Sequence, residues 1–161
     1  MSLAAAPSNA QPRIALRAIG WGGLVSGVLD ITAAFVVYGR FGAKPIRLLQ
    51  GIAAGLLGPS AFVGGLPVAA LGLLCHFFIA FSAAAVYFAV SRWSKFAVQH
   101  AVVSGIVYGV LVYFFMNRVV VPLSAARNYP FSLKMMLIGV TIHVFCVGLP
   151  IAIAVRKYSV Q

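Results

Sequence analysis

Hydrophobic residues run along this chain in long stretches that are broken at prolines and bracketed by Arg or Lys. Four of these stretches are long enough to cross a bilayer, which takes about 20 helical residues. They cover residues 15–38, 68–90, 96–116 and 133–155. Because a backbone inside lipid must satisfy its own hydrogen bonds, each stretch predicts a transmembrane helix.

A further apolar segment, residues 45–58, is too short to span and begins at a proline. Its larger apolar side chains fall on one helical face, which predicts a short helix lying at the membrane interface or re-entering the bundle. Residues 1–14 are small and polar and predict a disordered tail, and residues 158–161 form a second tail. We therefore expect one four-helix transmembrane domain over residues 15–157.

The composition excludes a soluble globular domain. Of the 161 residues, 63% are hydrophobic and 8% are charged, and the mean hydropathy is +1.05. Soluble domains carry about 25% charged residues, and so little polar surface does not cover a globule of this size. We therefore expect an all-α integral membrane protein in contact with the lipid bilayer.

The charged residues are almost all basic: 12 Lys and Arg stand against one acid, Asp30, for a net charge of +11. The bases are scattered around the helix ends, which predicts contact with anionic lipid headgroups and not with nucleic acid. They divide equally between the two sides of the membrane, so the positive-inside rule gives no orientation. The short basic connection at residues 91–95 favours cytoplasmic termini.

Two parts of the chain resemble each other, which predicts two similar helical hairpins. Residues 25–27 (Val-Ser-Gly) match residues 103–105. The Gly-x-x-x-His-x-Phe pattern of residues 72–78 recurs at residues 139–145. The two offsets differ, as expected if the first hairpin contains the additional segment at residues 45–58.

Three Gly-x-x-x-Gly pairs predict close helix packing, because glycine allows two backbones to approach. The glycines are Gly23, Gly27, Gly51, Gly55, Gly105 and Gly109. Such pairs serve equally well within one bundle or between copies, so a homo-oligomer is compatible with the pattern.

Asp30 is the main anomaly, since a carboxylate near the bilayer centre costs about 2.5–3.5 kcal/mol on insertion scales and normally faces a partner inside the bundle. Counting at ~1.5 Å per residue from the middle of each span, Asp30, His76 and His143 fall within ~5 Å of the midplane on the same side. These three residues, from three different spans, are the candidate polar core.

Three interpretations of this core stay open. A carboxylate beside imidazoles is typical of a proton relay, because imidazole gains and loses a proton near neutral pH, and this would allow proton or small-solute conduction. His76 and His143 are alternatively the two axial ligands of a haem, with the glycine four residues before each leaving room for the ring. The third interpretation is a buried hydrogen-bonded core that stabilises the packing of a non-enzymatic protein.

Enzyme signatures are absent from the sequence. It contains no phosphate-binding Gly-rich loop with Lys, no His-Glu-x-x-His and no Gly-x-Ser-x-Gly. A single carboxylate also excludes paired acid–base chemistry within one chain. We expect no enzymatic activity, no metal and no obligatory cofactor.

The Gly–His helix around His76, the Gly-rich helix that ends in NRVVVPLS and the second Gly–His helix around His143 occur in this order. Over residues 71–153 this arrangement resembles the small bacterial inner-membrane proteins of the YagU type. The resemblance implies a bacterial inner-membrane protein without an established biochemical activity, with His76 and His143 at family-like positions. It does not extend to Asp30 or to residues 45–58.

Overall fold

The computed structural model describes residues 10–127 and 130–159, and no strand occurs among them. Its elements are α1 (Ala10–Gly39), α2 (Pro45–Leu57), η1 (Gly58–Val63), α3 (Gly65–Trp93), α4 (Lys95–Gln99), α5 (Ala101–Phe115), η2 (Met116–Val120), α6 (Val121–Leu123), α7 (Leu133–Ile142), η3 (His143–Gly148) and α8 (Leu149–Ser159). The η1 segment is a 3₁₀ helix, whereas η2 and η3 are π-helical.

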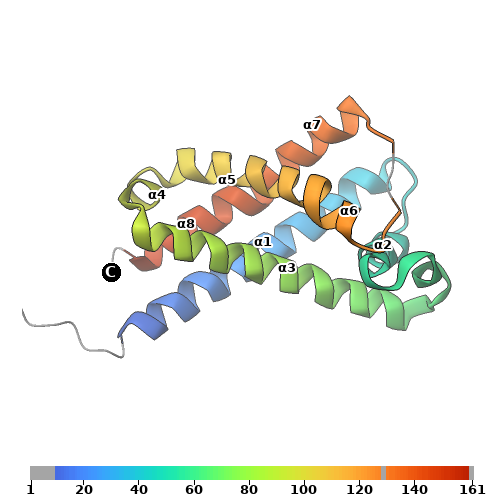
Figure 1. The fold of residues 1–161 in the computed structure, drawn as a ribbon, viewed down its shortest axis with the longest axis horizontal. Helices are drawn as coiled ribbons and strands as arrows, with labels where there is room; N and C mark the ends of the chain where they lie inside the picture. The colour runs from blue at the N-terminus through green and yellow to red at the C-terminus, as the bar shows by residue number, and fades with distance from the viewer. Residues whose placement is uncertain (1–9, 128–129, 160–161) are drawn as a thin grey trace, which may run out of the picture.

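The long helices run along the long axis of the molecule (Figure 1). The start of α1, the short helix α4 and the end of α8 lie at one end, and α2, α6 and the start of α7 lie at the other. The chain thus forms two hairpins, α1 with α3 and α5 with α7–η3–α8. The hairpins pack together mainly through α1 against η3 and α8.

By length and composition, five helical segments of the described chain are able to cross a membrane. They are Gln11–Gly39, Pro45–Val63, Gly65–Trp93, Ala101–Leu123 and Leu133–Ser159. The prediction of an all-helical chain with long apolar helices is confirmed. The segment predicted as a short helix is extended by η1 to 19 residues, and it remains the shortest of the five.

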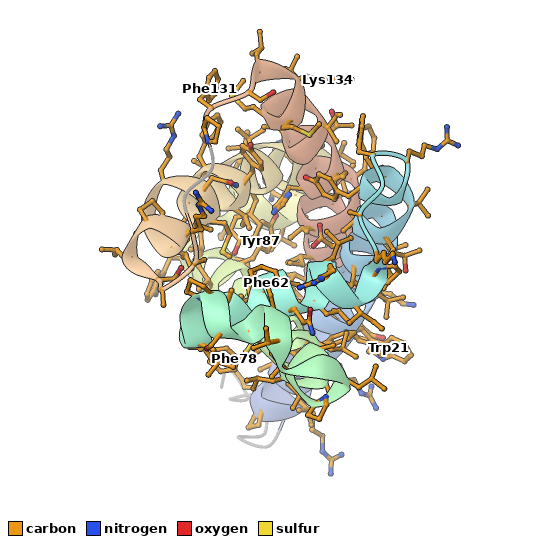
Figure 2. The ribbon with its side chains drawn as sticks, turned by 90° about the vertical axis from the view of Figure 1, so that its right-hand side faces the viewer. Trp21, Phe62, Phe78, Tyr87, Phe131 and Lys134 are labelled. Carbon is orange, nitrogen blue, oxygen red and sulfur yellow. The ribbon has the colours of Figure 1, made fainter. Side chains whose placement is uncertain are left out.

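This additional segment, α2 with η1, folds back on itself. The guanidinium of Arg47 donates a hydrogen bond of 2.8 Å to the carbonyl oxygen of Phe62, and the Gln50 amide donates one of 3.0 Å to that of Gly65. A straight helix would separate positions 47 and 62 by about 22 Å. The segment is seen end-on in Figure 1 and lies across the end of the molecule in Figure 2, where Phe62 is labelled.

Two of the three Gly-x-x-x-Gly pairs lie at helix crossings inside the chain. A Cβ on Gly27 would come within 2.7 Å of the Phe77 ring on α3, and Gly23 faces Phe81 in the same way. A Cβ on Gly109 would lie 2.6 Å from the carbonyl oxygen of His143. These glycines therefore allow α1 to approach α3 and α5 to approach η3 closely.

The remaining pair behaves differently. No described residue outside its own helix turn lies within 4 Å of a Cβ built on Gly51, and one on Gly55 would make an ordinary contact of 3.7 Å with Ser124. On α3, Gly72 is the glycine that lies tightly against α2, because a Cβ there would collide with the Leu49 backbone. The close approach of α2 therefore depends on a glycine outside the Gly-x-x-x-Gly pattern.

Apolar side chains cover the outer surface. Phe78 is 74% exposed, Leu74 69% and Phe145 63%. The buried core is instead made of small residues, with Ala18, Ala84 and Ala152 fully buried around Ile151. Such a surface is unfavourable in water and matches lipid.

Several helix ends differ from their predicted positions. Residues 10–14 belong to α1 and not to a tail, and α8 continues to Ser159. The span predicted at 96–116 is divided, because α4 ends at Gln99 and the helix that begins at Ala101 continues through η2 to Leu123. Residues 1–9 and 160–161 of the predicted tails lie outside the described residues.

Candidate functional site

Asp30, His76 and His143 line one cavity of about 200 Å³. The carboxylate comes from α1, His76 from α3, and His143 from the first residue of η3. The rest of the wall is largely apolar: Ser26, Ile52, Ile79, Ala80, Ala83, Val112, Met116 and Val147. The cavity therefore brings three titratable side chains from three helices to one apolar compartment.

His76 is buried and bonded to the neighbouring helix. Its Nε2 lies 2.8 Å from the carbonyl oxygen of Gly27. Because a carbonyl oxygen only accepts, Nε2 carries the hydrogen and donates. In the neutral ring, Nδ1 is then the nitrogen with a free lone pair. The contact across the α1–α3 crossing thus selects the tautomer of His76.

His143 is held within its own helix. Its Nδ1 donates a hydrogen bond of 2.9 Å to the carbonyl oxygen of Gly139, one turn earlier. The Tyr113 ring of α5 packs edge-on against the imidazole, with 5.4 Å between the centroids. In neutral His143 the lone pair is therefore on Nε2, the opposite tautomer to that of His76.

Asp30 is partly buried at the cavity wall. Among residues 10–127 and 130–159 its carboxylate forms no hydrogen bond or ion pair, and the cavity wall contains no Lys or Arg. In this part of the chain, two buried side-chain oxygens have no hydrogen-bond partner, Ser104 Oγ and Ser159 Oγ. The Asp30 carboxylate oxygens are not among them. Asp30 is thus an acid that shares its cavity with two histidines but with no Lys or Arg.

Two π-helical segments border the cavity, and no sequence pattern indicated them. Met116 is the first residue of η2 and His143 is the first residue of η3, and both line the wall. A π turn inserts one residue into a helix and rotates the side chains that follow, and such turns are frequent at functional sites. Pro122 lies just beyond η2, and Pro150 lies just beyond η3. These prolines are the nearest sequence signal for the two π-helical segments.

The residues do not fit a bis-histidine haem. The Nε2 of His76 is engaged by Gly27, and a volume of about 200 Å³ lies below the roughly 300–1,000 Å³ of cofactor pockets. The glycines expected to leave room for the ring are already in contact with protein, Gly72 with the Leu49 backbone and Gly139 with the Tyr113 ring. In the described part of the chain, no three His, Cys, Asp or Glu side chains form a metal-binding group.

An apolar groove of about 520 Å³ adjoins the cavity on its α3–α5 side. The groove is lined by exposed side chains such as Phe78, Val86 and Leu111. Four residues, Ile79, Ala83, Val112 and Met116, line both the groove and the cavity. The polar compartment and the outer surface are therefore separated by a single layer of side chains.

The chain matches no protein-family model, no curated protein and no solved structure. The class of protein follows from the fold itself. The described residues form an all-helical fold with five apolar helices of membrane-spanning length. This is the fold of an integral membrane protein.

Proposed function

We propose that this is a non-enzymatic, multi-pass membrane protein whose Asp30–His76–His143 cavity binds and passes protons. The observation that carries the proposal is the shared cavity: one acid and two imidazoles from three helices face the same apolar compartment. The wall contains no Lys or Arg to neutralise Asp30, so proton uptake is the simplest way to remove the cost of its charge inside a bilayer.

Four crossings fit the geometry better than five. The Arg47–Phe62 hydrogen bond brings together the two ends of the segment formed by α2 and η1, so it enters and leaves at the same end of the molecule. The other four helical segments run from one end to the other (Figure 1). We propose that α2 and η1 form the interfacial or re-entrant helix, with both termini on one side, which we assign to the cytoplasm of a bacterium. The YagU-type resemblance agrees with this location.

Each histidine has one ring nitrogen free of its backbone contact, Nδ1 in His76 and Nε2 in His143. Each of these nitrogens accepts a proton while the other nitrogen keeps its hydrogen bond. A proton taken from the Asp30 carboxyl is therefore able to rest on either ring without breaking the contacts that hold the rings. The small volume of the cavity is sufficient for protons and a few water molecules.

The test is proton flux into liposomes that contain purified protein and a pH-sensitive dye. An imposed pH gradient should collapse faster than in empty liposomes, and Asp30→Asn, which keeps the shape of the side chain, should abolish the additional flux. His76→Gln and His143→Gln should each reduce it. His100→Gln is the matched control, since His100 is exposed and lies outside the cavity. An unchanged flux in Asp30→Asn would overturn the proposal.

A second candidate is binding of a small, lipid-soluble amine at Asp30, which the shared wall of groove and cavity favours. The neutral amine would enter from the bilayer between α3 and α5, take the proton of the Asp30 carboxyl and remain as an ammonium–carboxylate pair. Triethylamine, a small lipid-soluble amine that is able to take up a proton, is a suitable probe for equilibrium binding in detergent. Asp30→Asn should abolish binding and Val112→Phe should weaken it, whereas Leu137→Phe, outside groove and cavity, should not. Absence of binding to the unmodified protein would exclude this candidate and leave the proton proposal standing.

A further inference from the structure

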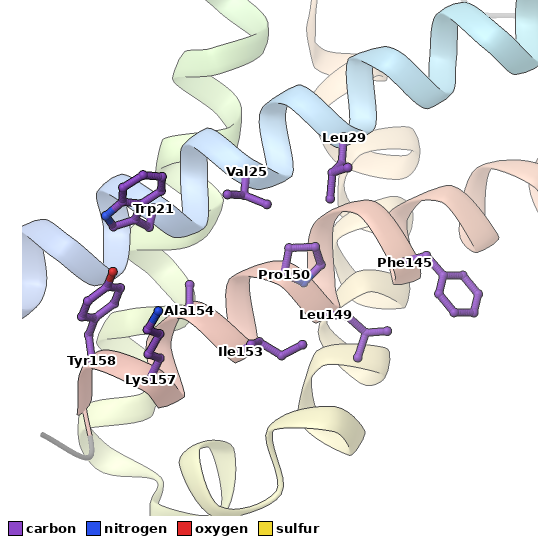
Figure 3. Close-up of a pocket in the computed structure, with 10 residues that line it drawn as sticks. All are labelled: Trp21, Val25, Leu29, Phe145, Leu149, Pro150, Ile153, Ala154, Lys157 and Tyr158. Carbon is purple, nitrogen blue, oxygen red and sulfur yellow. The ribbon is translucent and has the colours of Figure 1, made fainter.

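A second groove, of about 610 Å³, lies between α1 and α8 and shares no residue with the polar cavity. Figure 3 shows the ten side chains that line it. Seven of them are aliphatic, proline or phenylalanine: Val25, Leu29, Phe145, Leu149, Pro150, Ile153 and Ala154. The other three, Trp21, Lys157 and Tyr158, carry an indole N–H, an ammonium and a hydroxyl.

The polar groups gather at one end of the groove. In Figure 3, Trp21, Lys157 and Tyr158 lie together, while Leu29 and Phe145 lie at the opposite end. The Lys157 ammonium is 5.8 Å from the centre of the Tyr158 ring. The groove is thus apolar along its length and cationic at one mouth, which is the complement of an anionic phospholipid.

The length of the groove also matches a lipid. Along α1 it extends from Trp21 to Leu29, about 12 Å of helix, and on the other side from Phe145 to Tyr158, about 20 Å. One leaflet contributes roughly half of a hydrocarbon core that is about 30 Å thick. An acyl chain of one leaflet therefore fills the groove when its headgroup lies beside Lys157.

Charge favours an anionic headgroup over a zwitterionic one. Arg156 precedes Lys157, and the only acid of the chain, Asp30, lines the other cavity. Tryptophan and tyrosine are the side chains that prefer the headgroup level of a membrane. Trp21 lies beside Tyr158 at the end of α8.

We propose that the α1–α8 groove is a binding site for one anionic phospholipid. Its phosphate lies at Lys157, within reach of the Tyr158 hydroxyl and the Trp21 indole N–H, and one acyl chain lies along α1 and α8. The site differs from general attraction between a basic protein and an anionic membrane, because it depends on Lys157 and not on the neighbouring Arg156.

Trp21 provides the measurement. The chain has two tryptophans, and Trp93 is 88% exposed, so Trp93→Phe leaves Trp21 as the only tryptophan fluorophore in a variant expected to fold. This variant is titrated in mixed micelles with phosphatidylglycerol whose acyl chains carry bromine, a quencher that acts at short range. The same titration is performed with brominated phosphatidylcholine.

Phosphatidylglycerol should quench Trp21 at a mole fraction about fivefold lower than phosphatidylcholine, as expected for one additional juxtamembrane cation–anion contact. Adding Lys157→Gln should shift the phosphatidylglycerol curve to that of phosphatidylcholine, whereas Arg156→Gln should leave it in place. Coincident curves for the two lipids would overturn the proposal. Equal shifts for Lys157→Gln and Arg156→Gln would also overturn it, by showing surface attraction alone.

Discussion

The imidazole of His76 on α3 donates a hydrogen bond of 2.8 Å from Nε2 to the carbonyl oxygen of Gly27 on α1. The same Gly27 lies against the Phe77 ring so closely that a Cβ would not fit. The absence of a side chain at Gly27 therefore has two effects. It allows the helices to approach, and it lets a histidine of α3 reach the backbone of α1 beside Asp30.

Replacement of His76 tests how much this contact stabilises the fold. His76→Ala removes the hydrogen bond and leaves a void, and we expect it to lower the free energy of unfolding by about 1–3 kcal/mol. His76→Gln retains a hydrogen-bond donor and should lower the free energy of unfolding by less than His76→Ala does. Unfolding by sodium dodecyl sulfate in mixed micelles gives the measurement. His100→Ala, at an exposed position, should change stability by less than about 0.5 kcal/mol. A loss at His100 equal to that at His76 would contradict the assignment.

Gly109 and Gly51 form a matched pair for helix packing. Gly109→Ala would place a Cβ 2.6 Å from backbone atoms of His143 and Val144, and such overpacking costs about 1–3 kcal/mol. Among residues 10–127 and 130–159, the new Cβ of Gly51→Ala meets no atom of another element within 4 Å, and alanine is the better helix former by up to about 1 kcal/mol. The same unfolding measurement should therefore show a loss for Gly109→Ala and none for Gly51→Ala. Equal effects would mean that α5 and η3 are not in close contact.

Much of this arrangement is predictable from local patterns. Long apolar stretches with basic ends predict the long helices, because the bilayer sets their length. Counting residues along the predicted spans places Asp30, His76 and His143 at one level, and the structure has all three in one cavity wall. Such a count is possible because the rise per residue of a helix is nearly constant.

Features that depend on tertiary contacts are not predictable in this way. The π turns at Met116 and His143 depend on the neighbouring helices, and their extra residue leaves no periodic signal. The contact of Gly72 with the Leu49 backbone depends on how α2 folds back, which the composition of residues 45–58 does not specify. For the same reason, the sequence alone does not show that Gly51 lies in open space.

The number of membrane crossings is testable by labelling. Phe41 and Leu66 are exposed residues on either side of α2 and η1. If this segment does not cross, cysteines introduced as Phe41→Cys and Leu66→Cys should react with a membrane-impermeant maleimide from the same side. Gln99→Cys, at the opposite end of the molecule, should react from the other side. Cys75 and Cys146 are first replaced by serine, which should be tolerated because both are only partly buried. Labelling of Phe41→Cys and Leu66→Cys from opposite sides would require five crossings.

Tyr108 links α5 to α3, the two helices that line the apolar groove. Its hydroxyl donates a hydrogen bond of 2.7 Å to the carbonyl oxygen of Ala83, and its ring packs against Tyr87 at 4.9 Å between centroids. Tyr108→Phe should lower the free energy of unfolding by about 0.6 kcal/mol, and by no more than about 1.7 kcal/mol. It should also allow the helices to separate.

Spin labels at Val86 and Leu111, exposed residues on the two walls, report this separation. Electron–electron distance measurements should give a broader and longer distribution in Tyr108→Phe than in the parent protein. Tyr113→Phe is the matched control, since the Tyr113 hydroxyl forms no hydrogen bond among residues 10–127 and 130–159 and its ring contact with His143 is retained. An unchanged distribution in Tyr108→Phe would show that the α3–α5 spacing is held by side-chain packing and not by this hydrogen bond.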